Sequence, residues 1–114
     1  MSVKAFLEKV KESPKQIEFN ELMDLIEKHY SFTETAFVNG DLKNEAGENS
    51  GSCKLFAFAQ LQGLDQAQTL ACFGTYYRED VLKDPTGNNH QNIRNFMRTG
   101  WDGIGFKGVA LTGL

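Results

Sequence analysis

The residues of this chain that could do chemistry begin with Cys53, at the boundary between a polar loop and an apolar segment. The stretch Gly47–Gly63 reads GENSGSCKLFAFAQLQG and predicts a flexible loop that leads into a helix. A thiol at a helix start feels the positive end of the helix dipole, which favours the thiolate. A nucleophilic thiolate needs a base, and His90 is the better of the two histidines because it follows a turn and opens a helix. One hypothesis is therefore a small thiol-dependent hydrolase or transferase that uses Cys53 and His90.

A simpler interpretation is that Cys53 is a small residue packed at a helix start, and we favour it. Cys53 and Cys72 are the two cysteines among 114 residues, which is too few for a disulfide framework. Both are therefore expected to be reduced thiols of a cytoplasmic protein.

The sequence NNHQNIRNFMRTGW holds a second group of polar residues. His90, Arg94 and Arg98 are spaced at i, i+4 and i+8, so they share one helix face. The two arginines are suited to hold a carboxylate or a phosphate, together with the free N–H groups of the helix start, Asn88 and Asn92. The second hypothesis is therefore an anion-binding protein.

The alternative role for the two arginines is structural. Arg94 and Arg98 would then pin the polar loop by pairing with carboxylates, of which the chain offers Glu45, Glu48, Glu79 and Asp80. We favour this alternative, and we expect part of Asn44–Ser52 to lie against the start of the last helix. A third interpretation joins the two, with the loop and the last helix forming a single cleft.

Charge and composition argue against several functions. A net charge of −3 disfavours a general nucleic-acid binder, which carries a basic excess. Two His and two Cys are too scattered for a zinc site, and Asp41, Glu45 and Glu48 lack the alternating spacing of a calcium loop. No apolar run is long enough for a signal peptide or a membrane span. We therefore expect no cofactor, no metal, no nucleic acid and no membrane partner.

Hydrophobic periodicity and turn residues predict about five helices that position these groups. They run from residue 3 to the stop at Ser13-Pro14, over Phe19–Tyr30, over Cys53–Gln62, from a cap at Asp65 to Val81, and from a cap at Asn88 or Asn89 to Gly100. We expect a mainly α-helical, compact single domain over residues 1–114, with a short strand pair near Phe32–Val38 and in the Gly-rich tail.

The inward faces of these helices predict one shared core. It contains Phe56, Phe58, Leu70, Ile93 and Phe96. Gly74 interrupts the apolar stripe of the fourth helix, where it costs about 1 kcal/mol of helix propensity relative to Ala. Such a residue indicates close packing at that point.

Four phrases of the sequence carry a resemblance to a known family. They are FVNG from Phe37, NEAGENSGSCKLFAFAQL from Asn44, FGTYYREDVLKDPTG from Phe73 and HQNIRNFMRTGW from His90. Together they resemble the HopJ family of type III effectors, and the match covers nearly the whole chain. The resemblance implies delivery into host cells and assigns no catalytic residue.

We expect a HopJ-type binding or interaction module without enzymatic activity. Its partner would be a protein or a small anionic ligand. The periodic helix that begins near residue 3 favours a resident cytoplasmic protein, whereas the effector resemblance implies secretion into host cells.

Overall fold

The computed structural model describes all 114 residues. Its first two helices lie where the sequence predicts them. α1 (Val3–Glu12) starts with the Ser2 hydroxyl accepting a hydrogen bond from the backbone N–H of Ala5, 3.0 Å away, and ends before Pro14. A short 3₁₀ turn, η1 (Pro14–Gln16), leads to α2 (Phe19–His29). The apolar periodicity therefore predicted both helices, with the end of α2 one residue beyond its observed position.

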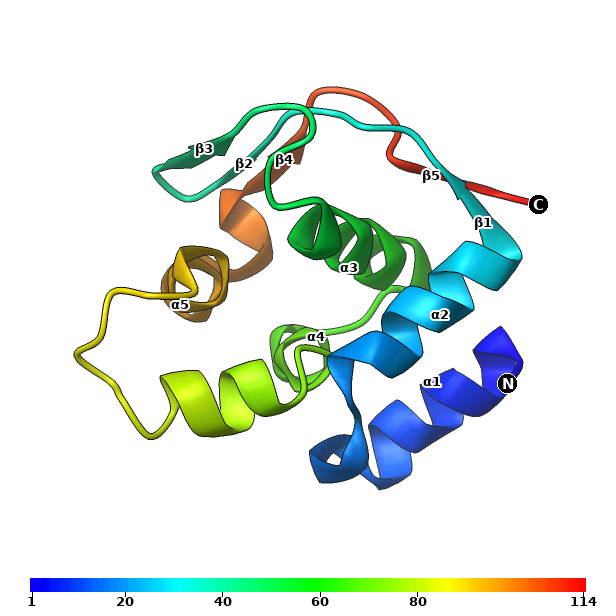
Figure 1. Ribbon diagram of the computed structural model, residues 1–114, viewed down its shortest axis with the longest axis horizontal. Coiled ribbons are helices and arrows are strands. Elements are labelled where there is room, and N and C mark those ends of the chain that lie inside the picture. The colour runs from blue at the N-terminus through cyan, green and yellow to red at the C-terminus, as the bar shows by residue number, and fades with distance from the viewer.

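The central helix, α3 (Ser50–Gln62), begins three residues before Cys53 and ends at Gly63. Gly63 has a left-handed backbone (φ 69°), which glycine adopts without steric cost. In Figure 1, α3 runs through the middle of the molecule, with α1 and α2 on one side and α5 on the other. Because the helix starts early, Cys53 lies one turn inside it.

The prediction of a single helix from Asp65 to Val81 is wrong, because the helix is interrupted at Gly74. Its two parts are α4 (Gln66–Ala71) and the π-helix η2 (Tyr76–Val81). Gly74 has φ +64°, and a Cβ there would lie 2.8 Å from the backbone nitrogen of Phe19. The close packing predicted at Gly74 is present, and it ends the helix.

The last helix, α5 (Gln91–Thr99), follows His90 and ends at Gly100. The predicted asparagine cap is wrong, because His90 occupies the N-cap position with a left-handed backbone and no side-chain capping bond. A 3₁₀ turn, η3 (Gly100–Gly103), then leads into the final strands.

Five strands of three residues form two small antiparallel sheets, so the fold is α+β and the mainly α prediction is wrong. β1 (Tyr30–Phe32) pairs with β5 (Leu111–Gly113). The second sheet has the order β3-β2-β4, with strands β2 (Phe37–Asn39), β3 (Leu42–Asn44) and β4 (Ile104–Phe106). Strands this short show little alternation of apolar and polar residues, and two of the three pairings join distant parts of the chain.

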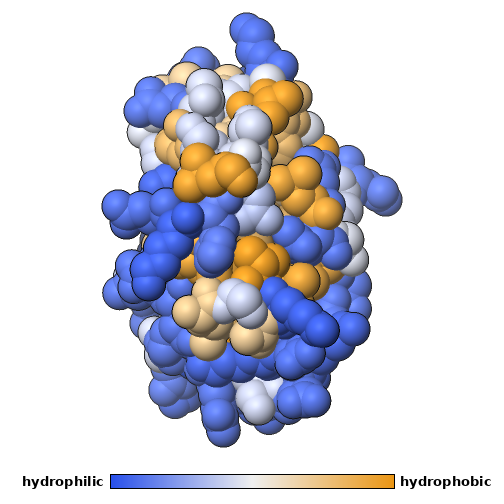
Figure 2. All heavy atoms as spheres, turned by 90° about the vertical axis from the view of Figure 1, so that its right-hand side faces the viewer, coloured by the Kyte–Doolittle hydropathy of each residue, from blue (hydrophilic) through white to orange (hydrophobic).

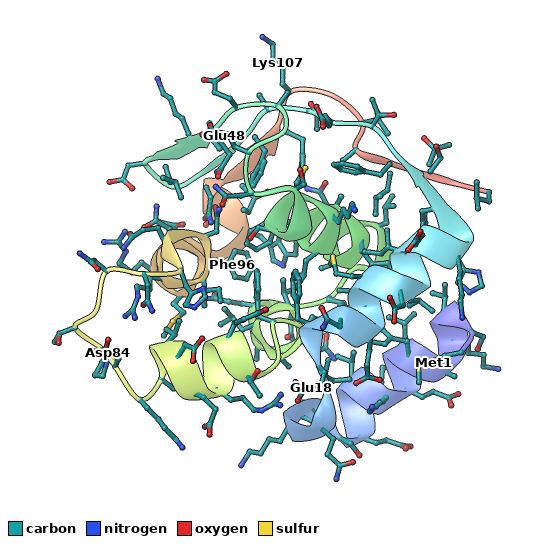
Figure 3. The ribbon with its side chains drawn as sticks, in the orientation of Figure 1. Met1, Glu18, Glu48, Asp84, Phe96 and Lys107 are labelled. Carbon is teal, nitrogen blue, oxygen red and sulfur yellow. The ribbon has the colours of Figure 1, made fainter.

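One cluster of 22 buried residues forms the core. All five residues predicted to share it are buried: Phe56, Phe58, Leu70, Ile93 and Phe96. Figure 3 shows Phe96 pointing from α5 towards the interior, where its ring centroid lies 5.0 Å from that of Phe56 and 5.2 Å from that of Trp101. The predicted helix faces are therefore confirmed at these five positions.

Both chain ends lie on one side of the molecule. Figure 2 shows that this face is mostly hydrophilic, with separate apolar groups across its middle. No helix combines the length and the apolar composition needed to cross a bilayer.

Candidate functional site

Cys53 lies in the core and is not a poised thiolate. Its side chain is buried, its backbone N–H bonds to the carbonyl of Asn49, and its sulfur lies 3.9 Å from the carbonyl oxygen of Thr35. Burial raises the pKa of the Cys53 thiol, and this outweighs the lowering effects of the Thr35 hydrogen bond and the Lys54 charge. The predicted stabilisation of the thiolate is therefore wrong.

His90 has partners other than Cys53. Its Nε2 lies 3.1 Å from a carboxylate oxygen of Asp80, and its ring packs beside Tyr76 with centroids 5.4 Å apart. No hydrogen bond joins His90 to Cys53. The structure thus does not bring the two residues together as a base and a nucleophile.

Arg94 holds the loop that precedes α5. It donates to the backbone and side-chain oxygens of Asn89, at 2.6 and 2.7 Å, and to the carbonyl of Asp84 at 2.8 Å. Asn88, in the same loop, accepts a hydrogen bond from the side chain of Gln91. Arg94 therefore fixes residues 84–89, which lie outside the polar loop Asn44–Ser52.

Arg98 donates to the side-chain oxygen of Asn95 and is otherwise exposed. The ion pairs predicted between the arginines and nearby carboxylates are absent. Glu48 instead accepts from the backbone N–H of Glu45 at 2.8 Å, whereas Glu79 pairs with Lys83. The predicted pairing was wrong at Glu48, Glu79 and Asp80 because these carboxylates have other partners.

Asparagines, not charges, attach the polar loop to α5. Asn92 and Asn44 exchange two amide hydrogen bonds, and Asn39 donates to the backbone and side-chain oxygens of Asn92 at 2.7 and 3.0 Å. Asn95 donates to the carbonyl of Asn39 at 2.9 Å. The sequence placed Asn44 in the loop expected to meet the last helix, but it did not indicate that Asn39 and Asn95 are buried at this contact.

A hollow of about 400 Å³ lies where α3 and α5 begin. We call it the α3–α5 pocket. Its polar side is formed by Asn49, Gly51 and Ser52 of one helix start and by His90 and the residues after it. Its apolar side is formed by Leu42, Phe19, Phe73, Tyr76 and Ile93. No Asp or Glu lines this pocket.

Two unusual backbone conformations flank the α3–α5 pocket. Asn49 (φ 50°) and His90 (φ 51°) are the N-caps of α3 and α5, and they are the two non-glycine residues of the chain with positive φ. Such conformations often cluster at functional sites. Neither side chain caps its helix, so the backbone N–H groups of Ser50–Ser52 and of Gln91 and Asn92 have no protein acceptor.

The fold is that of a small α+β protein, with two short sheets and a break between α4 and η2. Its candidate site is a pocket between two helix starts. The family model of the HopJ type III effector protein matches residues 3–111, and the chain belongs to that family. A crystal structure described as "unknown function protein VPA0580" is 55% identical to it, with a TM-score of 0.98. That match covers 100% of this chain and 95% of the other. No curated protein matches the chain.

Proposed function

We propose that this HopJ protein is a binding module without enzymatic activity, and that the α3–α5 pocket binds an anionic group. The observation that supports this is a hollow at two helix starts with no carboxylate in its lining, in a chain with a net charge of −3. The bound group would be a carboxylate or a phosphate, carried by a small ligand or by a partner protein.

The physical reason lies in the two helix ends. Each helix start carries about half a positive charge from its aligned peptide dipoles, so two starts together offer about one unit of positive charge. Free N–H groups at both starts can donate to the oxygens of an anion. The rings of Phe19, Phe73 and Tyr76 would pack against an apolar or aromatic part of the same ligand.

The thiol-enzyme alternative has less support. Cys53 does not line the α3–α5 pocket, and its thiol is buried and bonded elsewhere. A nucleophile must reach both its base and its substrate. The effector description of the family supports delivery into host cells, and we place the action of this protein in a cytoplasm.

Binding of phenyl phosphate tests the proposal, because this probe joins an anion to an aromatic ring. Ser52→Glu would place a carboxylate at the third position of α3, where an acidic residue favours the helix and repels a bound anion. We expect its dissociation constant to rise about tenfold or more, which corresponds to about 1.4 kcal/mol.

Gln60→Glu is the matched control, because it makes the same charge change at an exposed position of the same helix. Its affinity for phenyl phosphate should equal that of the wild type. Absence of saturable binding to the wild type would overturn the proposal, and so would equal affinities of both variants.

A further inference from the structure

A second hollow adjoins the α3–α5 pocket along the same helix. It measures about 390 Å³, lies between α5 and the end of η2, and is lined by Val81, Leu82, Pro85, Arg94, Met97 and Arg98, with Gly87 and Gln91 between them. We call it the α5 groove. Gln91 lines both hollows, so the two are neighbours that share this side chain as a wall.

The lining of the α5 groove is basic. It contains two arginines and no Asp or Glu. The lining of the adjoining α3–α5 pocket contains no Arg, Lys, Asp or Glu. Arg94 is committed to the loop before α5, whereas Arg98 is exposed and donates to Asn95 alone. Three acidic residues lie near the groove without lining it: Asp80 pairs with His90, Asp84 lies beside Gly87, and Asp41 accepts a hydrogen bond from Asn95, the partner of Arg98.

The α5 groove also has exposed apolar side chains. Leu82 is 48% exposed and Met97 is 37% exposed, and they face the same hollow above the buried Val81. An apolar side chain from a partner would remove both from water, which favours binding. Arg98 beside Leu82 and Met97 therefore suits a ligand in which a carboxylate lies next to an apolar side chain.

We propose that the partner of this protein is an acidic, extended protein segment that lies along α5 across both hollows. One carboxylate pairs with Arg98, the adjacent apolar side chain lies between Leu82 and Met97, and a second carboxylate enters the α3–α5 pocket. This proposal rests on the proposed function and adds the chemical class of the partner. From His90 to Arg98 the helix rises about 12 Å, which an extended segment spans in about four residues.

The test uses two five-residue peptides with blocked ends, EFELE and its basic counterpart KFKLK. The change Arg98→Gln removes the exposed cation, and Lys107→Gln makes the same charge change at an exposed position. Figure 3 shows Lys107 at the far end of the molecule from the loop of Asp84. We expect EFELE to bind the wild type and the Lys107 variant equally, and the Arg98 variant about tenfold more weakly. KFKLK should not bind.

The same proteins titrated with phenyl phosphate separate the two proposals. Arg98→Gln should leave binding of this small probe unchanged, because Arg98 does not line the α3–α5 pocket. If phenyl phosphate binds but EFELE does not, or if both variants bind EFELE equally, the extended partner is wrong while the pocket remains. Failure of both probes would overturn both proposals.

Discussion

Asn44 and Asn92 lie 48 residues apart in the chain and exchange two side-chain hydrogen bonds, of 3.2 and 3.0 Å. Both residues are buried. Asn44 ends β3 and Asn92 lies in the first turn of α5, so this pair attaches the polar loop to the last helix. Asn49, the N-cap of α3, donates to the same oxygen of Asn44 at 2.7 Å. The pair therefore holds the two helix starts of the α3–α5 pocket in place.

Asn92→Ala should lower the free energy of unfolding by about 1–3 kcal/mol for each buried amide donor that it leaves without an acceptor. Asn44→Ala should also destabilise. The double variant should lose less free energy of unfolding than the sum of the losses of the two single variants, because either change alone already breaks the reciprocal pair. Urea denaturation of the four proteins measures this, and strictly additive losses would show that the amide pair is not a unit.

Phe96→Ala should lower the free energy of unfolding by about 3–5 kcal/mol, because the ring is fully buried between Phe56 and Trp101. Met97→Ala is the control on the same helix, with a partly exposed side chain, and should change stability by about 0.5 kcal/mol or less. Equal effects of the two changes in denaturant titrations would contradict the packing of α5.

Both thiols should react slowly with a thiol reagent in the native protein. Cys53 and Cys72 are buried, and burial raises the pKa of each thiol, so little thiolate is exposed. In denaturant both should react rapidly. Fast labelling of Cys53 under native conditions would contradict its burial and would restore the case for a reactive thiol.

Stability should fall at alkaline pH because of Cys72. Burial raises the pKa of this thiol from an ordinary 9.0 to about 12 in the folded protein. The unfolded chain therefore loses the proton first, so the contribution to stability is fully present below pH 9 and is lost as the pH rises towards 12. Relative to Cys72→Ala, the wild type should lose up to about 1.4 kcal/mol more per pH unit in this window. If the free energies of unfolding of the two proteins fell in parallel with pH, the raised pKa of Cys72 would be contradicted.

Local signals predicted the helices well, and long-range pairing explains what they missed. The Ser2 cap and the apolar stripes set α1 and α2, and Gly63 and Gly100 ended two later helices where expected. The strands were predicted only as one short pair near Phe32–Val38 and in the Gly-rich tail, where β2 does pair with β4. Their number and bounds were missed because each has three residues and depends on a distant partner, as when β1 pairs with β5. The break at Gly74 depends on the backbone of Ile17–Phe19, which no local pattern reveals.

The site was predicted only in outline. The sequence indicated that the polar loop and the last helix meet, and the contact between Asn44 and Asn92 confirms this. It did not indicate that Asn49 and His90 take left-handed conformations, because asparagine and histidine adopt them more often than most residues but still only in a minority of cases. The favoured interpretation of Cys53 as a small packed residue agrees with its burial, whereas the thiolate hypothesis fails because an earlier helix start moved the residue one turn into the core.

The central claim is that the α3–α5 pocket binds an anion through two helix starts. It is tested most directly by following the backbone amide signals of the full chain by NMR during titration with phenyl phosphate. The account predicts that the amides of Gly51, Ser52 and Asn92 shift together with one dissociation constant, and that Ser52→Glu raises this constant about tenfold or more. Shifts confined to other parts of the molecule, or none at all, would contradict it.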